Sequence, residues 1–263
     1  MDATVLLKSV PDPEAPPESF AFEGPVPDTA DVPWVLGPFE ENALELGLRV
    51  AEGSHGSVRV LAMGGVEQEK GLRKGLALGA VDAWRVDGPS TWDDPLAAAR
   101  ILAAGATLLG DADLVVVGRQ AGDWDRSVTG GLLAGLLGIP YLARVCDAAV
   151  DDRGVIVCQE VPGGTRRGRL RPPAVLAVTN APTTVLRMAN VRDALLAARK
   201  PIHVVTAASL LDGSLPVQRL VTIDVSARRV GRAGRRVTGD PAEVAECLVA
   251  KLEGLGVLDG ATR

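Results

Sequence analysis

Apolar runs alternate with amphipathic stretches along the first half of the chain. The runs are short and rich in Val, Leu and Ala, which is typical of strands, and they cover residues 4–10, 57–63, 83–86 and 113–117. The amphipathic stretches between them carry apolar residues at helical spacing: one begins at Pro38, one contains Leu72 and Leu76, and one covers residues 95–109. This alternation favours βαβ units with right-handed crossovers and a parallel sheet.

The pattern changes after Pro140, where strand-like segments are joined by turns that contain Asp or Gly. Residues 142–150, 154–160 and 166–171 predict an antiparallel meander. Beyond it, the sequence predicts a strand at residues 173–179, a helix at 189–199 and an amphipathic helix at 241–254. We expect an α/β fold: a doubly wound, mostly parallel sheet with an antiparallel strand insert and a C-terminal arm.

The expected division of the chain is an α/β domain at residues 1–203 and an arm at residues 204–263. The arm has apolar positions between residues 210 and 221 that have no evident place in a doubly wound core. Exposed apolar patches of this kind mark interaction surfaces, so the arm is expected to pack on a partner subunit.

Residues 115–131 read as a buried strand, a polar loop with glycines, and the start of a helix. Small and hydroxyl residues precede the helix, so its first N–H groups and its positive dipole end point toward the loop. A phosphate suits such a place. From these residues alone, a phosphate site and a plain turn of a doubly wound sheet remain equally open.

Composition narrows the classes of function. A net charge of -5 argues against nucleic acid as a main partner. The N-terminus lacks the features of a signal peptide, and no run approaches the ~20 apolar residues of a membrane span, so a cytoplasmic protein without membrane insertion is expected. The three cysteines have no metal-ligand spacing, and no nucleophile elbow, Walker loop or HExxH motif is present. We therefore expect no catalytic residue and no metal site, and take Asp123 and Asp125 as N-cap and loop-ordering groups.

Five segments, in the right order, resemble the beta subunit of electron transfer flavoproteins over nearly the whole chain. Residues 5–12 are similar to the family's opening "VxVKxVPD", 37–45 to "NPFDExALEEAL", and 72–80 to "LRxALAMGAD". Residues 118–130 are similar to "GKQAIDDDxxQTG", and 163–175 to "GGxExxxxxLPAVxT".

The resemblance implies an electron carrier without bond-making catalysis of its own, which passes electrons from a dehydrogenase to a respiratory, quinone-linked or other acceptor. It implies an alpha subunit that holds FAD, and a beta subunit that binds AMP, or a second FAD in bifurcating members. The implied nucleotide-binding residues, carried over by motif, are Leu6, Gly37, Pro38, Phe39, Glu40, Met63, Gly118, Arg119, Gln120, Ala121, Asp123, Asp125, Arg126, Ser127, Val128, Thr129 and Gly130.

Two of the chain's departures from the family concern the nucleotide site and the docking segment. Gly37 stands where an asparagine is usual, and the signature "LNxPRYxxLxxIMKAKKKPI" survives only partly at residues 182–202. That segment includes the loop that docks dehydrogenases, which implies partner docking by Arg187, Met188 and Val191. Here Met188 replaces the tyrosine and Val191 the anchoring leucine.

Some alternatives stay open. A free-standing adenine-nucleotide-binding protein of universal-stress type is the second interpretation, although it needs neither the antiparallel insert nor the arm. Thr129 favours AMP over a second FAD, because its hydroxyl donates to a terminal phosphate, while Gly122 and Gly131 leave room for a larger ligand. The role of Trp124 and that of the Arg-rich segment 228–236 are left open.

Overall fold

The computed structural model describes the chain except residues 23, 89–93, 214, 227–235 and 259–263. Two compact units make up the chain, residues 1–225 and residues 226–263. The boundary lies after residue 225, whereas the expected arm starts at residue 204.

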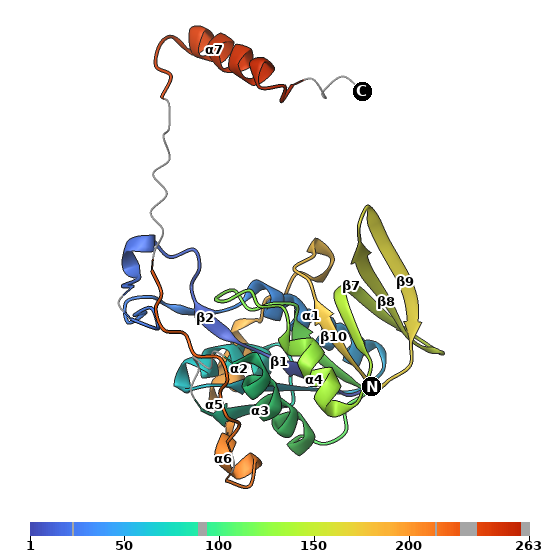
Figure 1. Ribbon diagram of the computed structural model, residues 1–263. Helices are drawn as coiled ribbons and strands as arrows, with labels where there is room; N and C mark the ends of the chain where they lie inside the picture. The colour runs from blue at the N-terminus through green and yellow to red at the C-terminus, as the bar shows by residue number, and fades with distance from the viewer. Residues whose placement is uncertain (23, 89–93, 214, 227–235, 259–263) are drawn as a thin grey trace. The chain divides into compact units, whose positions relative to one another are not determined.

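The first unit is built on a nine-stranded sheet with the order β11-β5-β4-β1-β6-β10-β7-β8-β9 (Figure 1). Seven of these strands form the parallel part, from β11 to β7, and β8 and β9 extend it as antiparallel strands. The strands are β1 Ala3–Leu6, β4 Val58–Met63, β5 Asp82–Asp87, β6 Leu114–Gly118, β7 Tyr141–Asp151, β8 Gly154–Val161, β9 Gly164–Leu170, β10 Ala174–Val178 and β11 His203–Thr206. The expected α/β fold with an antiparallel insert is confirmed.

Helices cover both faces of the parallel strands (Figure 1). One core cluster contains residues of α1, α2 and α5, and the other contains residues of α3, α4 and α6. The helices are α1 Pro38–Gly53, α2 Glu69–Ala77, α3 Pro95–Leu108, α4 Thr129–Leu137, α5 Val191–Arg199, α6 Ala207–Leu210 and, in the second unit, α7 Pro241–Gly254. Short 3₁₀ turns are η1 Pro17–Ser19, η2 Val66–Gln68 and η3 Pro182–Thr184. None of the helices in the described ranges is both long and apolar enough to span a membrane.

Strand β1 lies at the switch point of the sheet. Its neighbours are β4 on one side and β6 on the other, and Val5 is in register with both Val60 and Val116. Along the chain, β4 and β5 are therefore added on one side of β1, and β6 is added on the other side. In open α/β sheets the ligand crevice lies at such a point, beyond the carboxyl ends of the strands.

The expected single strand at residues 4–10 is wrong: β1 ends at Leu6, and β2 Ser9–Pro11 pairs antiparallel with β3 Trp34–Leu36 in a separate small sheet. The side chain of Gln68 explains the break. Its amide accepts from the backbone N–H of Ser9 at 2.7 Å and donates to the Ser9 carbonyl at 3.0 Å. A side chain from a distant turn thus replaces the ladder that a continuing strand would need.

The region after residue 200 divides between the two units. β11 joins the edge of the parallel sheet beside β5, so His203 to Thr206 belong to the sheet. In the second unit α7 buries none of its residues. Of the Arg-rich segment, Arg228, Arg229, Arg232 and Arg235 lie outside the described residues.

Candidate functional site

A pocket of about 140 Å³ opens at the carboxyl ends of β1 and β6, where the topology predicts a ligand. On the same measure one water molecule needs only about 10–15 Å³, so the pocket is large enough for a bigger ligand. The lining residues are Leu6, Leu7, Lys8, Glu40, Met63, Pro95, Ala98, Leu102, Val117, Gly118, Arg119, Gln120, Ala121, Asp123, Trp124, Asp125, Arg126, Ser127, Val128 and Thr129.

The loop after β6 is ordered by the side chain of Gln120. Its amide nitrogen donates to Asp125 Oδ1 at 2.7 Å, and its carbonyl oxygen accepts from Ser127 Oγ at 3.2 Å. Asp125 and Ser127 have φ values of 49° and 55°, in the left-handed region that non-glycine residues seldom occupy. The loop therefore holds strained backbone in a fixed shape, a feature that clusters at ligand sites.

Two helices border this pocket, and they begin differently. Asp94 caps α3 by accepting from the N–H groups of Leu96 and Ala97 at 2.9 and 3.3 Å. Helix α4 begins after Val128, whose side chain makes no cap. Of the expected N-cap and loop-ordering roles of Asp123 and Asp125, the loop-ordering role is confirmed, since Asp125 accepts from Gln120 and Asp123 accepts from the N–H of Trp124, whereas the N-cap role is wrong for α4. No side chain in the described part of the chain caps α4, so its first N–H groups are available to an anion.

Charged side chains meet at the rim of the pocket. Lys8, just after β1, forms an ion pair with Asp123 of the loop. The guanidinium of Arg126 lies over the ring of Trp124, 5.4 Å from its centroid. This contact gives Trp124 a structural partner.

Glu40, in the first turn of α1, is the most unusual group in the wall. Only 5% of it is exposed, and its Oε2 atom has no hydrogen-bond partner among the described residues. A Cβ atom at Gly37 would lie 2.2 Å from Oε2, and one at Gly118 would lie 3.0 Å from Oε1. Two glycines therefore make room for the carboxyl group. Burial raises its pKa to about 8, against the smaller lowering effects of its own backbone N–H and of Lys8.

The structure brings most of the implied nucleotide-binding residues into this one pocket. Gly37, Pro38, Phe39 and Gly130 are not among the lining residues. Gly37 nonetheless lies against the Glu40 carboxyl group. Gly130 lets α4 approach the sheet, since a Cβ there would lie 2.9 Å from Val117 Cγ2 and 3.1 Å from the Tyr141 ring. Whether any of these residues binds a nucleotide stays a prediction.

Sequence reasoning missed one wall of the pocket. Pro95, Ala98 and Leu102 of α3 line it at spacings of three and four residues. Their sequence signal was an ordinary amphipathic helix face, and only the topology shows that it faces a pocket. Leu7 and Lys8 were within the opening motif and Val117 within the strand before the loop, but none was assigned a role, and the role of Trp124 was left open.

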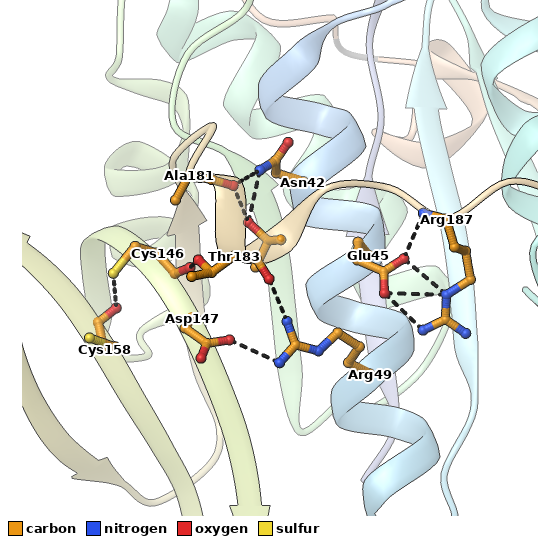
Figure 2. A network of polar contacts seen from close by, with 10 residues as sticks. Asn42, Glu45, Arg49, Cys146, Asp147, Cys158, Ala181, Thr183 and Arg187 are labelled. Atoms are coloured by element: carbon orange, nitrogen blue, oxygen red, sulfur yellow. Dashed lines mark hydrogen bonds and ion pairs between the residues drawn. The ribbon is translucent and has the colours of Figure 1, made fainter.

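A polar network ties the segment after β10 to α1 and β7 (Figure 2). Asn42 Nδ2 donates at 2.8 Å to both the Ala181 carbonyl and Thr184 Oγ1. Thr183 Oγ1 donates to the Cys146 carbonyl at 2.6 Å, and Arg49 donates to the Thr183 carbonyl at 2.9 Å. The network thus holds residues 181–184 against α1 and β7, and the residues that follow start from this fixed position.

The three residues with an implied docking role follow this network. Arg187 is anchored, because its guanidinium donates to Glu45 Oε1 and Oε2 at 2.9 Å each and to Glu52 Oε1 at 2.5 Å (Figure 2 shows the Glu45 contacts). Glu45 and Glu52 raise the pKa of Arg187. Met188 and Val191 instead project outward, with exposed fractions of 94% and 78%. Docking by these residues stays a prediction.

The pocket offers hydrogen-bond donors, a free helix N-terminus and cations to an anionic ligand. Among the described residues no cluster of three or more His, Cys, Asp or Glu side chains is placed to hold a metal. Cys146 is buried and Cys247 exposed, and the described cysteines are free thiols.

Comparisons with known proteins find related sequences over most of the chain. Residues 26–210 match the electron transfer flavoprotein domain family. An electron transfer flavoprotein subunit beta of Bradyrhizobium diazoefficiens is 32% identical over 78% of this chain and 82% of its own. The subunit beta of Thermoanaerobacterium thermosaccharolyticum is 29% identical over 98% of this chain and 100% of its own, and that of Sus scrofa is 32% identical over 84% and 85%.

Proposed function

The chain belongs to the electron transfer flavoprotein beta-subunit family, and we propose that it pairs with an alpha subunit that holds FAD and itself binds AMP in the pocket described above. The pair carries electrons from a dehydrogenase to a respiratory, quinone-linked or other acceptor. In this proposal the chain makes and breaks no bonds: it binds nucleotide and docks partners.

The uncapped N-terminus of α4 is the observation that carries the AMP proposal. Its free N–H groups suit a phosphate, and the hydroxyls of Ser127 and Thr129 border the same pocket. Arg119 and Arg126 add positive charge at the lining. The donors and cations of the pocket thus fit an adenine nucleotide with its phosphate near α4.

In this proposal Thr129 favours AMP over a second FAD. A hydroxyl there donates to a terminal phosphate oxygen, a charge-assisted bond that contributes roughly 1.5–3 kcal/mol. Gly122 has only Val10 Cγ2 near its Cβ position, at 3.6 Å, so the loop leaves some room for a larger group. AMP is the proposed ligand, and a second FAD is the alternative outcome of the test.

The exposed Met188 and Val191 are the proposed contact with the dehydrogenase. They follow a segment that Asn42 and Arg187 hold against α1, so two apolar side chains are presented on an anchored base. A few residues that become buried near the centre of an interface contribute most of its affinity, and the exposed Met188 and Val191 are the proposed candidates here.

The test is the nucleotide released when the purified heterodimer is denatured. One flavin per heterodimer together with released AMP supports the proposal, and two flavins with no AMP contradicts it. A stable monomer that ignores a co-expressed alpha subunit would contradict the pairing.

A variant locates the nucleotide. Thr129→Glu places a carboxylate at the pocket and is expected to expel the nucleotide by like-charge repulsion. Thr165→Glu, on the exposed strand β9, is the matched control and should keep it. Equal nucleotide content in both variants would place the site elsewhere.

A further inference from the structure

The Glu40 carboxyl group lies in the wall of the candidate pocket without a neutralising partner. Its Oε2 atom is buried and unpartnered among the described residues, and glycines at positions 37 and 118 keep side chains out of the space it fills. A buried polar atom without a partner costs free energy unless a ligand satisfies it. The orphaned oxygen therefore points to a ligand contact.

The charges around Glu40 come from three elements. Lys8, after β1, is the cation that acts on it, but Lys8 forms its ion pair with Asp123. Asp123 of the loop after β6 and Glu41 of α1 both add negative charge. Burial together with Asp123 and Glu41 outweighs the opposite effect of Lys8, which raises the pKa of Glu40 to about 8 and favours the protonated carboxylic acid.

Protonation changes what Glu40 offers to a ligand. A carboxylate only accepts hydrogen bonds and repels a phosphate, whereas a neutral carboxylic acid donates one and repels nothing. An anionic ligand in the same pocket raises the pKa of Glu40 further, because it disfavours a second negative charge. Ligand binding and protonation of Glu40 thus reinforce each other.

We propose that Glu40 contacts the bound nucleotide as an uncharged carboxylic acid and donates a hydrogen bond to it, so that binding takes up a proton wherever Glu40 is ionised beforehand. This inference rests on the proposed nucleotide site and assigns the residue that makes its occupancy depend on pH.

The experiment is calorimetric titration of the nucleotide-free full chain with AMP between pH 7 and 9.5, in buffers of different ionisation enthalpy. The window lies above the phosphate pKa of about 6, so AMP itself adds no proton exchange. Proton uptake should rise toward one per AMP above pH 8, with affinity falling about tenfold per pH unit there.

Two variants assign the proton. Glu40→Gln keeps a neutral side chain of the same shape and should bind AMP without pH dependence or proton uptake. Glu41→Gln removes a charge from the same helical turn, where Glu41 pairs with Lys74 outside the pocket. This variant should keep both the pH dependence of AMP binding and the proton uptake. Circular dichroism verifies that each variant folds.

An infrared spectrum gives a second measurement on the unaltered chain. A band of a protonated carboxylic acid at pH 7 that shifts when AMP is added supports the inference. AMP affinity equal at pH 7 and 9, or a pH dependence that persists in Glu40→Gln, overturns it while leaving the nucleotide site intact. If neither AMP nor FAD binds the wild-type chain, the proposed function fails and this inference fails with it.

Discussion

Replacing Glu40 by Gln is expected to stabilise the nucleotide-free protein, by an amount that depends on pH. In the unfolded chain Glu40 releases its proton near the ordinary pKa of 4.5, whereas in the folded chain it keeps the proton up to about pH 8. Stability is therefore lost as pH rises from about 4.5 to about 8, and none of it is regained above that range. A side chain that never ionises avoids this loss.

The magnitude follows from the two pKa values. Each pH unit between 4.5 and about 8 is equivalent to 1.36 kcal/mol, so the full loss is about 5 kcal/mol. At pH 7 the loss is about 3 kcal/mol, because the folded chain still holds its proton there. The free energy of unfolding of Glu40→Gln should therefore exceed that of the wild type by about 3 kcal/mol at pH 7 and by about 5 kcal/mol at pH 9.

Urea unfolding followed by far-ultraviolet circular dichroism measures this difference between pH 5 and 9. Glu41→Gln is the control, and its difference from the wild type should vary much less across this range, because Glu41 is half-exposed and has the smallest effect among the charges that act on Glu40. A difference between wild type and Glu40→Gln that stays constant from pH 5 to 9 would refute the reasoning, since it would mean that Glu40 titrates alike in both states.

Two further predictions concern charges near this site and near the docking segment. Lys8→Met should raise the pKa of Glu40 and Asp123→Asn should lower it, since Lys8 favours the carboxylate and Asp123 disfavours it. Infrared titration of the carboxyl band measures both shifts, and shifts in the same direction would contradict this prediction. Arg187→Ala should destabilise the fold by roughly 1.5–3 kcal/mol, because it leaves buried carboxylate oxygens without their donor. In urea unfolding, the exposed Arg192→Ala is its control, and equal stability of the two variants would count against the anchoring role.

Much of the fold was readable because its signals are local. The strands at β4 to β6 are apolar runs between amphipathic segments, and the turns of the β7 to β9 meander carry Asp or Gly. The break between β1 and β2 was not readable, because it depends on Gln68, which lies 59 residues from Ser9 in the sequence. A side chain that replaces a strand ladder leaves no periodic signal.

The candidate site likewise has one part that the sequence predicted and one part that it did not. The loop of Gly118 to Thr129 was found from its strand–loop–helix pattern, and the topology places it beside the end of β1. The environment of Glu40 was not predictable, since it depends on the approach of Gly118 and on the pairing of Lys8 with Asp123. Burial and charge pairing are properties of the folded chain. The sequence could therefore indicate Glu40 as a residue of the site, but it could not indicate that Glu40 is protonated.

The position of β10 in the sheet has a consequence for synthesis on the ribosome. β10 lies between β6 and β7 and pairs with β6 from Ala174↔Leu114 to Val178↔Gly118, so the outer edge of β6 stays open until β10 has been made. At about 5–20 residues per second, the roughly 60 residues from Gly118 to Val178 take about 3–12 s. During that interval a nascent chain presents an unpaired edge of an apolar strand, which is a template for aggregation. While the antiparallel insert is being translated, the outer edge of β6 is thus one that a chaperone would have to protect.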